Sequence, residues 1–209
     1  MALDRRRIVA EAVALLDEDG LDGVTLRRLA RRLGVQAPTL YWHIPNKAAL
    51  ITAIADEILK EKFDNPERPG RAESWPDWLS AVAVRLREAL LAHRDGARVV
   101  SAAQASVTMA GLSELAMSTL VARGVPLREA RLIVLTVEHF TMGHVLAEQS
   151  FRPDQDLPAG FDLASYAERY PTVVAGITGY FQPGRTVDDV FRDCLRLIID
   201  PAAQSYPES

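Results

Sequence analysis

The chain has 209 residues, 48% hydrophobic and 25% charged, which excludes an intrinsically disordered protein and allows one globular domain or two small ones. Its formal net charge of −4 argues against a protein that coats nucleic acid through bulk charge, although residues 1–50 carry eight basic against six acidic side chains. The single cysteine, Cys194, excludes an internal disulfide framework and a cysteine-based zinc site. No apolar run is long enough for a membrane span or a secretory signal, so we expect a cytoplasmic protein without a membrane partner.

Apolar residues recur at helical spacing along most of the chain, and no segment alternates with a period of two, so the pattern predicts an all-α fold. Thr25 and Asn46 are expected to cap helices, Gly20 and Gly34 to end them, and Pro201 to close the last one. The expected helices are 4–19, 25–33, 38–43, 47–63, 74–92, 97–103, 107–123, 126–150, 166–181 and 186–200. Residues 152–160 are expected to form a loop.

The two short helices at 25–33 and 38–43, joined by a tight turn with a glycine, match a helix-turn-helix. In this motif the second helix enters the major groove of DNA. Tyr41, Trp42 and His43 follow one another on that helix, and a small core needs one such ring rather than three. Four arginines on the first helix, at 27, 28, 31 and 32, are equally compatible with a solvated face. The combination favours binding to double-stranded DNA.

Residues 24–35, together with the run PTLYWHIPNK at 38–47, resemble the DNA-binding head of TetR-type transcriptional repressors. The PTLYWH stretch is typical of the branch around the tetracycline repressor. Residues 73–75, 93–99 and 139–146 resemble parts of the ligand-binding core of that branch. The resemblance implies a three-helix DNA-binding domain, residues 1–47, on a larger helical ligand-binding and dimerisation domain, residues 48–209.

The same resemblance implies a homodimer on a palindromic operator. The helices at 126–150, which is apolar on nearly every face, and at 186–200 would form a four-helix bundle with those of a partner. Arg27 would read a base, and Gln36 and Ala37 stand where base choice varies in the family. The residues expected to contact DNA are Thr25, Arg27, Gln36, Ala37, Pro38, Thr39, Tyr41, Trp42, His43 and Lys47. Of these, Thr25, Thr39, Tyr41, His43 and Lys47 would hold phosphates.

The pocket that binds magnesium–tetracycline in this branch is changed in the present sequence. Its drug-contacting positions are occupied here by Phe63, Val82, Leu86, Val100, Ala103, Gln104, Ala116 and Ala147. Val100 stands in place of the metal-ligating histidine, and valine cannot bind Mg²⁺. His139 remains, and Glu148 keeps a carboxylate one residue after Ala147. We therefore expect no metal, no cofactor and an effector other than tetracycline.

The remaining side chains predict a small, mainly apolar effector with few orienting polar groups. The expected effector residues are Phe63, Val82, Leu86, Val100, Ala103, Gln104, Val134, Glu138 and His139. Two interpretations stay open for His139, an effector contact or a packed histidine. Arg131 and Glu138 either pair with each other or meet a charged effector.

Catalytic motifs are incomplete, so we expect no enzyme. His93-Arg94-Asp95 resembles a kinase catalytic loop, but Val100 occupies the position of the required asparagine. The main expectation is a repressor that a small molecule releases from DNA. The alternative is a DNA-binding regulator, repressor or activator, without a small-molecule inducer.

Overall fold

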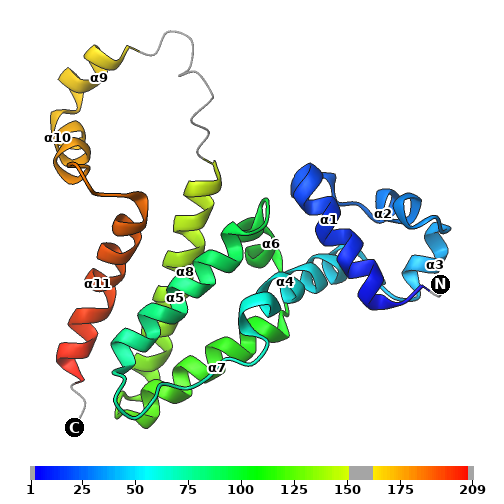
Figure 1. Ribbon diagram of the computed structural model, residues 1–209, viewed down its shortest axis with the longest axis horizontal. Helices are drawn as coiled ribbons and strands as arrows, with labels where there is room; N and C mark the ends of the chain where they lie inside the picture. The colour runs from blue at the N-terminus through cyan, green and yellow to red at the C-terminus, as the bar shows by residue number, and fades with distance from the viewer. Residues whose placement is uncertain (1–2, 151–161, 207–209) are drawn as a thin grey trace.

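The computed structural model describes residues 3–150 and 162–206, and within these ranges the chain forms eleven α-helices and no strand. They are α1 (Arg5–Gly23), α2 (Leu26–Leu33), α3 (Ala37–Tyr41), α4 (Lys47–Phe63), α5 (Trp75–Leu91), α6 (Gly96–Ala102), α7 (Val107–Ala122), α8 (Leu127–Ser150), α9 (Leu163–Arg169), α10 (Pro171–Tyr180) and α11 (Val187–Ser205). The predicted all-α fold with an N-terminal helix-turn-helix is confirmed (Figure 1). The loop expected at 152–160 lies outside the described residues.

Capping side chains determine where the N-terminal helices begin. The Thr25 hydroxyl accepts a hydrogen bond from the backbone N–H of Arg28 at 3.2 Å, and Asn46 accepts one from Ala49 at 2.8 Å. Gly34 closes α2 in the left-handed conformation, with φ 68°, which glycine adopts without steric cost. The three predicted helix boundaries are confirmed, because each side chain or glycine satisfies backbone groups that a helix end leaves free.

The predicted break at Gly20 is confirmed, because its backbone is not helical, and a further short turn within α1 continues beyond it to Gly23. Gly20 has φ 73° and ψ 177°, so the backbone N–H of Leu21 leaves the regular helical ladder. The Asp95 carboxylate, 74 residues further along the chain, accepts this N–H at 2.8 Å. A Cβ on Gly20 would lie 2.7 Å from the same carboxylate. A contact between distant segments therefore caps the last turn of α1, and no local pattern indicates it.

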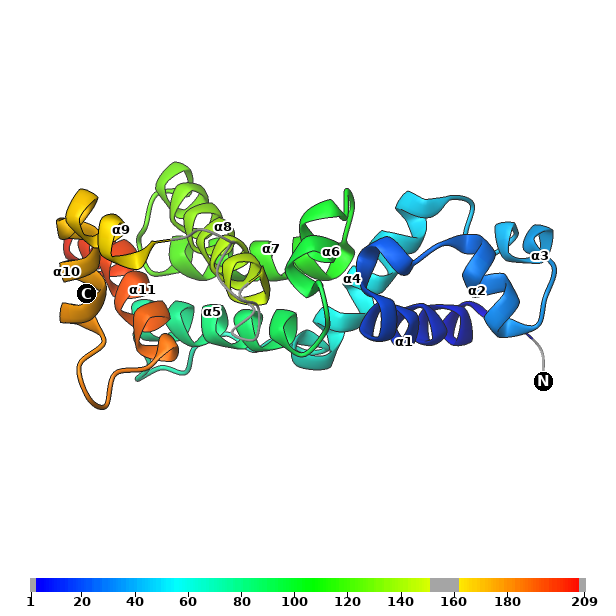
Figure 2. The same ribbon diagram turned by 90° about the horizontal axis from the view of Figure 1, so that it is seen from above.

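Helix α4 joins the N-terminal helices to the larger body of the protein. It packs against α1 on one side and against α5, α6 and α7 on the other. A single hydrophobic core runs through both parts, from Leu16 of α1 through Ile54 of α4 to Val134 of α8. In Figure 2, α1 to α3 lie at one end of an elongated molecule and α9 to α11 at the other. The predicted division after residue 47 falls at the start of α4.

The short third helix and the C-terminal helices differ from the sequence prediction. Helix α3 is Ala37–Tyr41 instead of 38–43. Residues 166–181, predicted as one helix, form α9 and α10, which are separated at Tyr170 because the following proline restricts that residue and has no N–H to donate. Helix α11 continues through Pro201 instead of ending there. Its packing against α5 and α8 compensates for the one hydrogen bond that proline removes.

No single helix among the described residues is long and apolar enough to span a membrane. The consecutive helices α6 and α7 pass that test only when they are joined across a bend of 85°. Both helices contribute buried side chains, Val100 and Leu112 among them, to the hydrophobic core.

Gly96, at the start of α6, provides a stability test of this packing. A Cβ there would lie 2.2 Å from the backbone carbonyl oxygen of Leu90, which cannot rotate away. We expect Gly96→Ala to lower the free energy of unfolding by about 1–3 kcal/mol in urea denaturation. Gly111→Ala is the control, because a Cβ on Gly111 in α7 meets open space and should raise stability by about 0.5–1 kcal/mol. Equal changes in the free energy of unfolding for the two substitutions would contradict the close approach of Gly96 to the backbone of Leu90.

Candidate nucleic-acid interface and effector core

The surface of α3 presents large side chains to solvent. Leu40 and Ile44 are buried and anchor the helix in the N-terminal core. Beside them, Tyr41 is 51% exposed and Trp42 is 90% exposed. Of the other predicted DNA contacts in this segment, Gln36, Pro38 and Thr39 are exposed, and Ala37 and His43 are half-buried. Two neighbouring aromatic rings kept in water on a helix this short indicate a binding surface.

Two arginines of α2 are committed to the fold. Arg28 forms an ion pair with Asp19 of α1, and Arg32 bonds to both Glu11 and Glu18 of the same helix. The Nη2 of Arg32 donates to Glu18 at 2.7 Å, and this hydrogen bond holds the pKa of Glu18 below its ordinary value. These contacts brace the helix-turn-helix against α1.

The other two arginines of α2 remain available for a partner. Arg27 and Arg31 are exposed, and neither forms an ion pair with any residue that the structure describes. They are four residues apart and so share one side of the helix. The solvated-face interpretation of the four arginines is therefore too simple, because two brace the fold and two extend into solvent.

The predicted phosphate contacts outside α3 lie at helix starts. Thr25 caps α2 through its hydroxyl oxygen, which leaves its O–H free to donate to another group. Lys47 is exposed at the first residue of α4. Helices α2 and α3 pack together, with the start of α4 following directly after them (Figure 1). The structure thus brings the predicted DNA contacts into one small helical unit.

The predicted effector residues divide by burial. Phe63, Val82, Leu86, Val100 and Val134 are buried in the common core, Ala103 and Glu138 are half-buried, and Gln104 and His139 are exposed. The apolar members are therefore part of the one hydrophobic core or pack against it. Gln104 and His139, expected to orient the effector, lie at the surface of the single chain. His139 lines a surface groove of about 270 Å³ between α6 and α8 with Ser101, Met142, Gly143 and Leu146.

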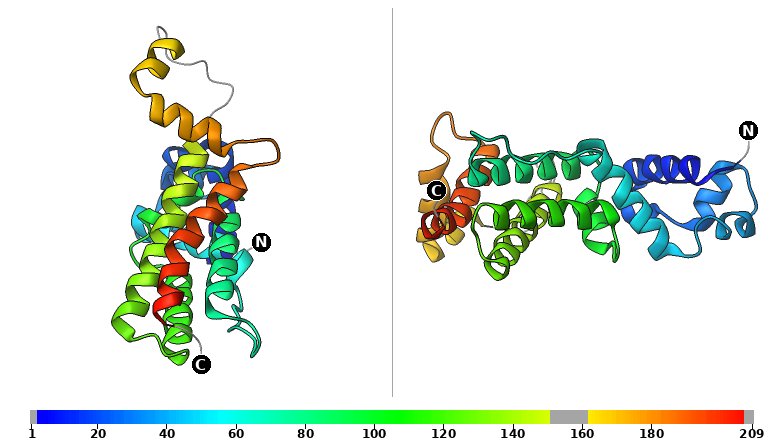
Figure 3. Two further views of the ribbon diagram at one scale, coloured as in Figure 1. Left: turned by 90° about the vertical axis from the view of Figure 1, so that its left-hand side faces the viewer. Right: turned by 90° about the horizontal axis from the view of Figure 1, so that it is seen from below.

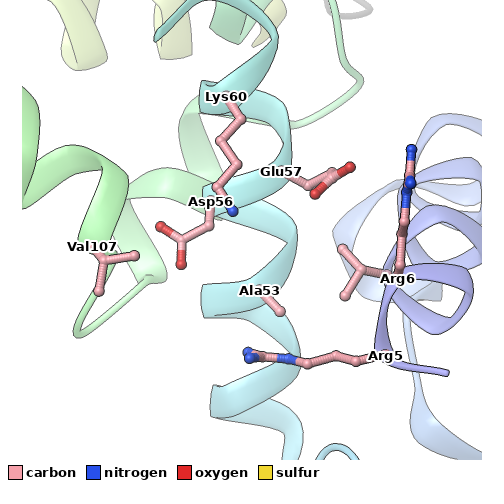
Figure 4. Close-up of a pocket in the computed structure, with 8 residues that line it drawn as sticks. Arg5, Arg6, Ala53, Asp56, Glu57, Lys60 and Val107 are labelled. Carbon is pink, nitrogen blue, oxygen red and sulfur yellow. The ribbon is translucent and has the colours of Figure 1, made fainter. Parts of the chain in front are cut away.

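A larger groove, of about 390 Å³, lies elsewhere. It is formed by α1, α4 and the start of α7, and contains none of the predicted effector residues (Figure 4). Arg5 and Lys60 reach into it from opposite walls, together with Asp56 and Glu57. Asp56 already accepts hydrogen bonds from Ser106 at 2.7 Å and from the backbone N–H at residue 108 at 3.1 Å. This groove is a charged surface rather than an apolar pocket.

Glu148, the carboxylate retained near the end of α8, is committed to a structural ion pair. Arg87 of α5 donates to both of its oxygens, at 2.8 and 3.1 Å, and to Asp188 of α11 at 2.7 Å. Both the Arg87 and the Glu148 side chains are largely buried. The pair joins three helices. Among the described residues, no three His, Cys, Asp or Glu side chains are grouped as a metal site.

Glu138 is a half-buried carboxylate without an ion-pair partner among the described residues. Its Oε1 lies 2.6 Å from the hydroxyl of Ser113 on α7, and that hydroxyl also lies 3.1 Å from the carbonyl of Met109. The Ser113 hydroxyl has a single proton, which it shares between the Glu138 carboxylate and the Met109 carbonyl as acceptors. Burial raises the pKa of Glu138, although Ser113 and the charge of Arg131 oppose the shift. A direct pair between Arg131 and Glu138, one of the two alternatives left open by the sequence, is not formed among the described residues.

Sequence analysis missed three positioning residues, namely Arg28, Arg32 and His93. The i, i+4 spacing of the two arginines opposite an acid-rich first helix was a usable signal. For His93 there was none, because its ring contacts carboxylates at residues 17 and 61, which are remote in sequence.

Fold and surface together define a helix-turn-helix regulator whose N-terminal helices are attached to a larger helical body. Residues 8–54 match the family described as bacterial regulatory proteins, tetR family, and residues 66–204 match the tetracyclin repressor-like C-terminal domain. The chain belongs to the TetR family, which confirms the resemblance found in the sequence.

Individual relatives support the same assignment. The class D tetracycline repressor protein of Escherichia coli is 38% identical over 165 residues, covering 75% of each chain. The crystal structure of a possible TetR family transcriptional regulator from Streptomyces coelicolor A3(2) has a TM-score of 0.82 at 32% identity, covering 97% of this chain and 100% of that one. BioQ, solved with its natural double-stranded DNA operator, has a TM-score of 0.64 at 31% identity, covering 85% of this chain and 99% of that one.

The raised pKa of Glu138 makes stability depend on pH. Ionisation of this group costs folding free energy, and the cost grows as pH rises from below the ordinary glutamate value through the raised one. Glu138→Gln cannot ionise. We expect the variant to resemble the wild type near about pH 4 and to exceed its free energy of unfolding increasingly toward neutral pH, measured by chemical denaturation. Glu114→Gln, at an exposed position of α7, is the control and should show no such trend. A difference in free energy of unfolding between Glu138→Gln and the wild type that does not change with pH would contradict the raised pKa of Glu138.

Proposed function

We propose that the protein is a ligand-responsive transcriptional repressor that binds a palindromic operator as a homodimer and is released by a small molecule other than tetracycline. One observation carries the proposal: Tyr41 and Trp42 at the end of α3 are exposed to solvent, and on the adjoining helix α2 the exposed Arg27 forms no ion pair with any described residue. The TetR-family fold, and a relative solved on its operator, support the same conclusion. Acting on DNA, the protein would work in the cytoplasm and would not be an enzyme.

The exposed side chains suit a division of roles at the operator. Arg27 is proposed to read a guanine, because the N–H groups of its guanidinium can donate to both acceptors that this base presents in the major groove. Thr25, Thr39, Tyr41, His43 and Lys47 are proposed to hold phosphates, and Pro38 and Trp42 to make apolar contacts. Gln36 and Ala37 would set a base preference of their own, since alanine offers a methyl group and no hydrogen bond.

Exposed leucines support a dimer through α8 and α11. These helices run side by side in Figure 3. Leu197 of α11 is 78% exposed, and Leu132 and Leu146 of α8 are also exposed. Covering these side chains with the same helices of a partner would form a four-helix bundle. The two heads would then meet successive major grooves, about 34–36 Å apart.

The effector core supports a mainly apolar ligand and no metal. Val100 and Val82 offer no oxygen or nitrogen to Mg²⁺. One observation favours the alternative, a regulator without a small-molecule inducer. The apolar effector residues belong to the buried core or pack against it, and none of them lines either of the two grooves described above.

Selection of binding sites from a random duplex DNA pool, at fixed physiological salt, tests the proposal. Enrichment of a two-fold palindrome is the expected result and would give the operator for all later assays. Binding that is salt-sensitive but enriches no sequence, with protein refolded free of small molecules, would overturn it.

Substitutions of Arg27 and Lys47 should impair binding to that operator in different ways. We expect Arg27→Ala to cost about 1–3 kcal/mol of binding and to relax base choice at one position. Lys47→Ala should weaken binding to all sequences alike and lower the slope of log affinity against log salt by about one. Arg28→Ala is the matched control, because Arg28 braces α1 and should change thermal stability without changing base choice. Fluorescence anisotropy with operator variants measures all three.

Tetracycline with magnesium should leave the operator complex intact. The reason is the loss of metal-binding and drug-binding groups, above all at Val100. The class D repressor of Escherichia coli, assayed in parallel on its own operator, is the positive control. Release of both proteins at the same tetracycline concentration would contradict the proposed change of effector.

A further inference from the structure

The groove between α1, α4 and the start of α7 has the size of a small-molecule site. Its volume is about 390 Å³, at the lower end of the range of about 300–1,000 Å³ that ligand pockets span. Val9 of α1 and Ala53 of α4 are buried side chains that give it apolar walls. Apart from Val107 at the start of α7, the other lining side chains are charged. A ligand in this groove would therefore be small and held mainly by charge.

Three cations line the groove without a partner of their own. Arg5 and Arg6 come from the first turn of α1, and Lys60 comes from α4 (Figure 4). All three residues are exposed, and none of their side chains forms an ion pair or a hydrogen bond with any residue that the structure describes. A guanidinium presents pairs of N–H donors that match a carboxylate or phosphate group. The groove thus offers unused donors to an anion.

The two acidic side chains of the groove do not neutralise these cations. Asp56 is engaged by α7, because its Oδ1 accepts hydrogen bonds from the Ser106 hydroxyl at 2.7 Å and from the backbone N–H of Thr108 at 3.1 Å. Figure 4 shows this carboxylate turned toward Val107. Glu57 is half-buried and forms neither an ion pair nor a side-chain hydrogen bond with a described residue. Three available cations therefore face one available carboxylate, which leaves an excess of two positive charges.

Part of this groove lies away from the proposed DNA surface. Lys47, a proposed phosphate contact, begins α4, whereas Lys60 lies near the other end of that helix, about 20 Å away along its axis. Val107, on the wall formed by α7, belongs to the larger body of the protein and not to the helix-turn-helix. A duplex bound by α3 and Lys47 would not extend to this end of α4. The position of the groove therefore favours a small ligand over a phosphate of DNA.

We propose that this groove binds a small organic or inorganic dianion, with carboxylate or phosphate groups, between the arginines of α1 and Lys60 of α4. Two negative charges on the ligand balance the excess of two positive charges in the groove. The apolar walls strengthen the attraction, because a concave surface of low dielectric constant concentrates the field of like charges. The bound dianion links α1 to α4 through charge-assisted hydrogen bonds. The site is separate from the predicted effector residues, none of which lines it.

Four variants test the site in protein without DNA. Lys60→Gln and Arg5→Gln each remove one of the proposed cations. Lys62→Gln is the matched control, because Lys62 is exposed on the same helix, pairs with Glu88 and does not line the groove. Glu57→Gln removes the negative charge that opposes the ligand. This last variant should bind the dianion more tightly, a result that loss of folding cannot produce.

Isothermal titration calorimetry with succinate and with inorganic phosphate, at constant ionic strength set by sodium chloride, measures the affinity. We expect saturable binding of both dianions and none of succinamide, the neutral analogue of succinate. Lys60→Gln and Arg5→Gln should each weaken the affinity about tenfold, the effect of losing one charge-assisted hydrogen bond. Lys62→Gln should change the affinity less than about twofold, because exposed charges outside the groove are screened by salt. Glu57→Gln should raise it about threefold, since a nearby like charge is removed.

Three outcomes would overturn the proposal. The first is no saturable binding of either dianion, and the second is an equal loss of affinity in Lys60→Gln and Lys62→Gln, which would mean diffuse attraction to the surface. The third is a DNA result: if Lys60→Gln lowers the slope of log operator affinity against log salt by about one, Lys60 holds a phosphate of DNA. We expect that slope to stay unchanged. Because the calorimetry contains no DNA, absence of operator binding alongside the expected dianion binding would overturn only the proposed function.

Discussion

The hydrogen bond that Asp95 accepts from Leu21 fixes the geometry on which the rest of the molecule depends. It is possible because Gly20 takes a backbone conformation that other residues avoid, and because that glycine has no side chain to collide with the carboxylate. The bond joins the first helix to the start of α6. This bond helps to orient the exposed side chains of the N-terminal helices α1 to α3 relative to the rest of the protein. Helix α4 connects the same two parts, because it packs against α1 and also against α5, α6 and α7.

Helix α2 shows how one short sequence serves both folding and recognition. Arg28 and Arg32 point back to the acidic side chains of α1, while Arg27 and Arg31 extend into solvent. The two pairs differ only by one position in the helical turn. A change that moved the helix by one residue would exchange their roles, so the ion pairs also fix which arginines face a partner.

Sequence reasoning succeeded where the responsible interactions are local. Caps at Thr25 and Asn46 and the left-handed Gly34 were readable because each acts within three or four residues. The break at Gly20 was also readable, but the turn that continues to Gly23 was not, because the carboxylate that accepts the Leu21 N–H is 74 residues away. The burial of apolar side chains such as Val100 was readable from helical spacing, but which of them leave space between them depends on side-chain packing that a pattern does not contain. The exposure of Gln104 and His139 was hidden for the same reason.

Helix α10 has a consequence for how the chain exists in solution. No side chain of this ten-residue helix is buried, and Val173, Ile177 and Phe181 at its end are exposed. Its tie to α11 is the hydrogen bond from the Tyr180 hydroxyl to Asp193 at 2.7 Å. Helices of this length are marginal in water without a packed face. In the homodimer proposed above, a partner that covered this helix would make folding of the segment a bimolecular event whose extent rises with concentration.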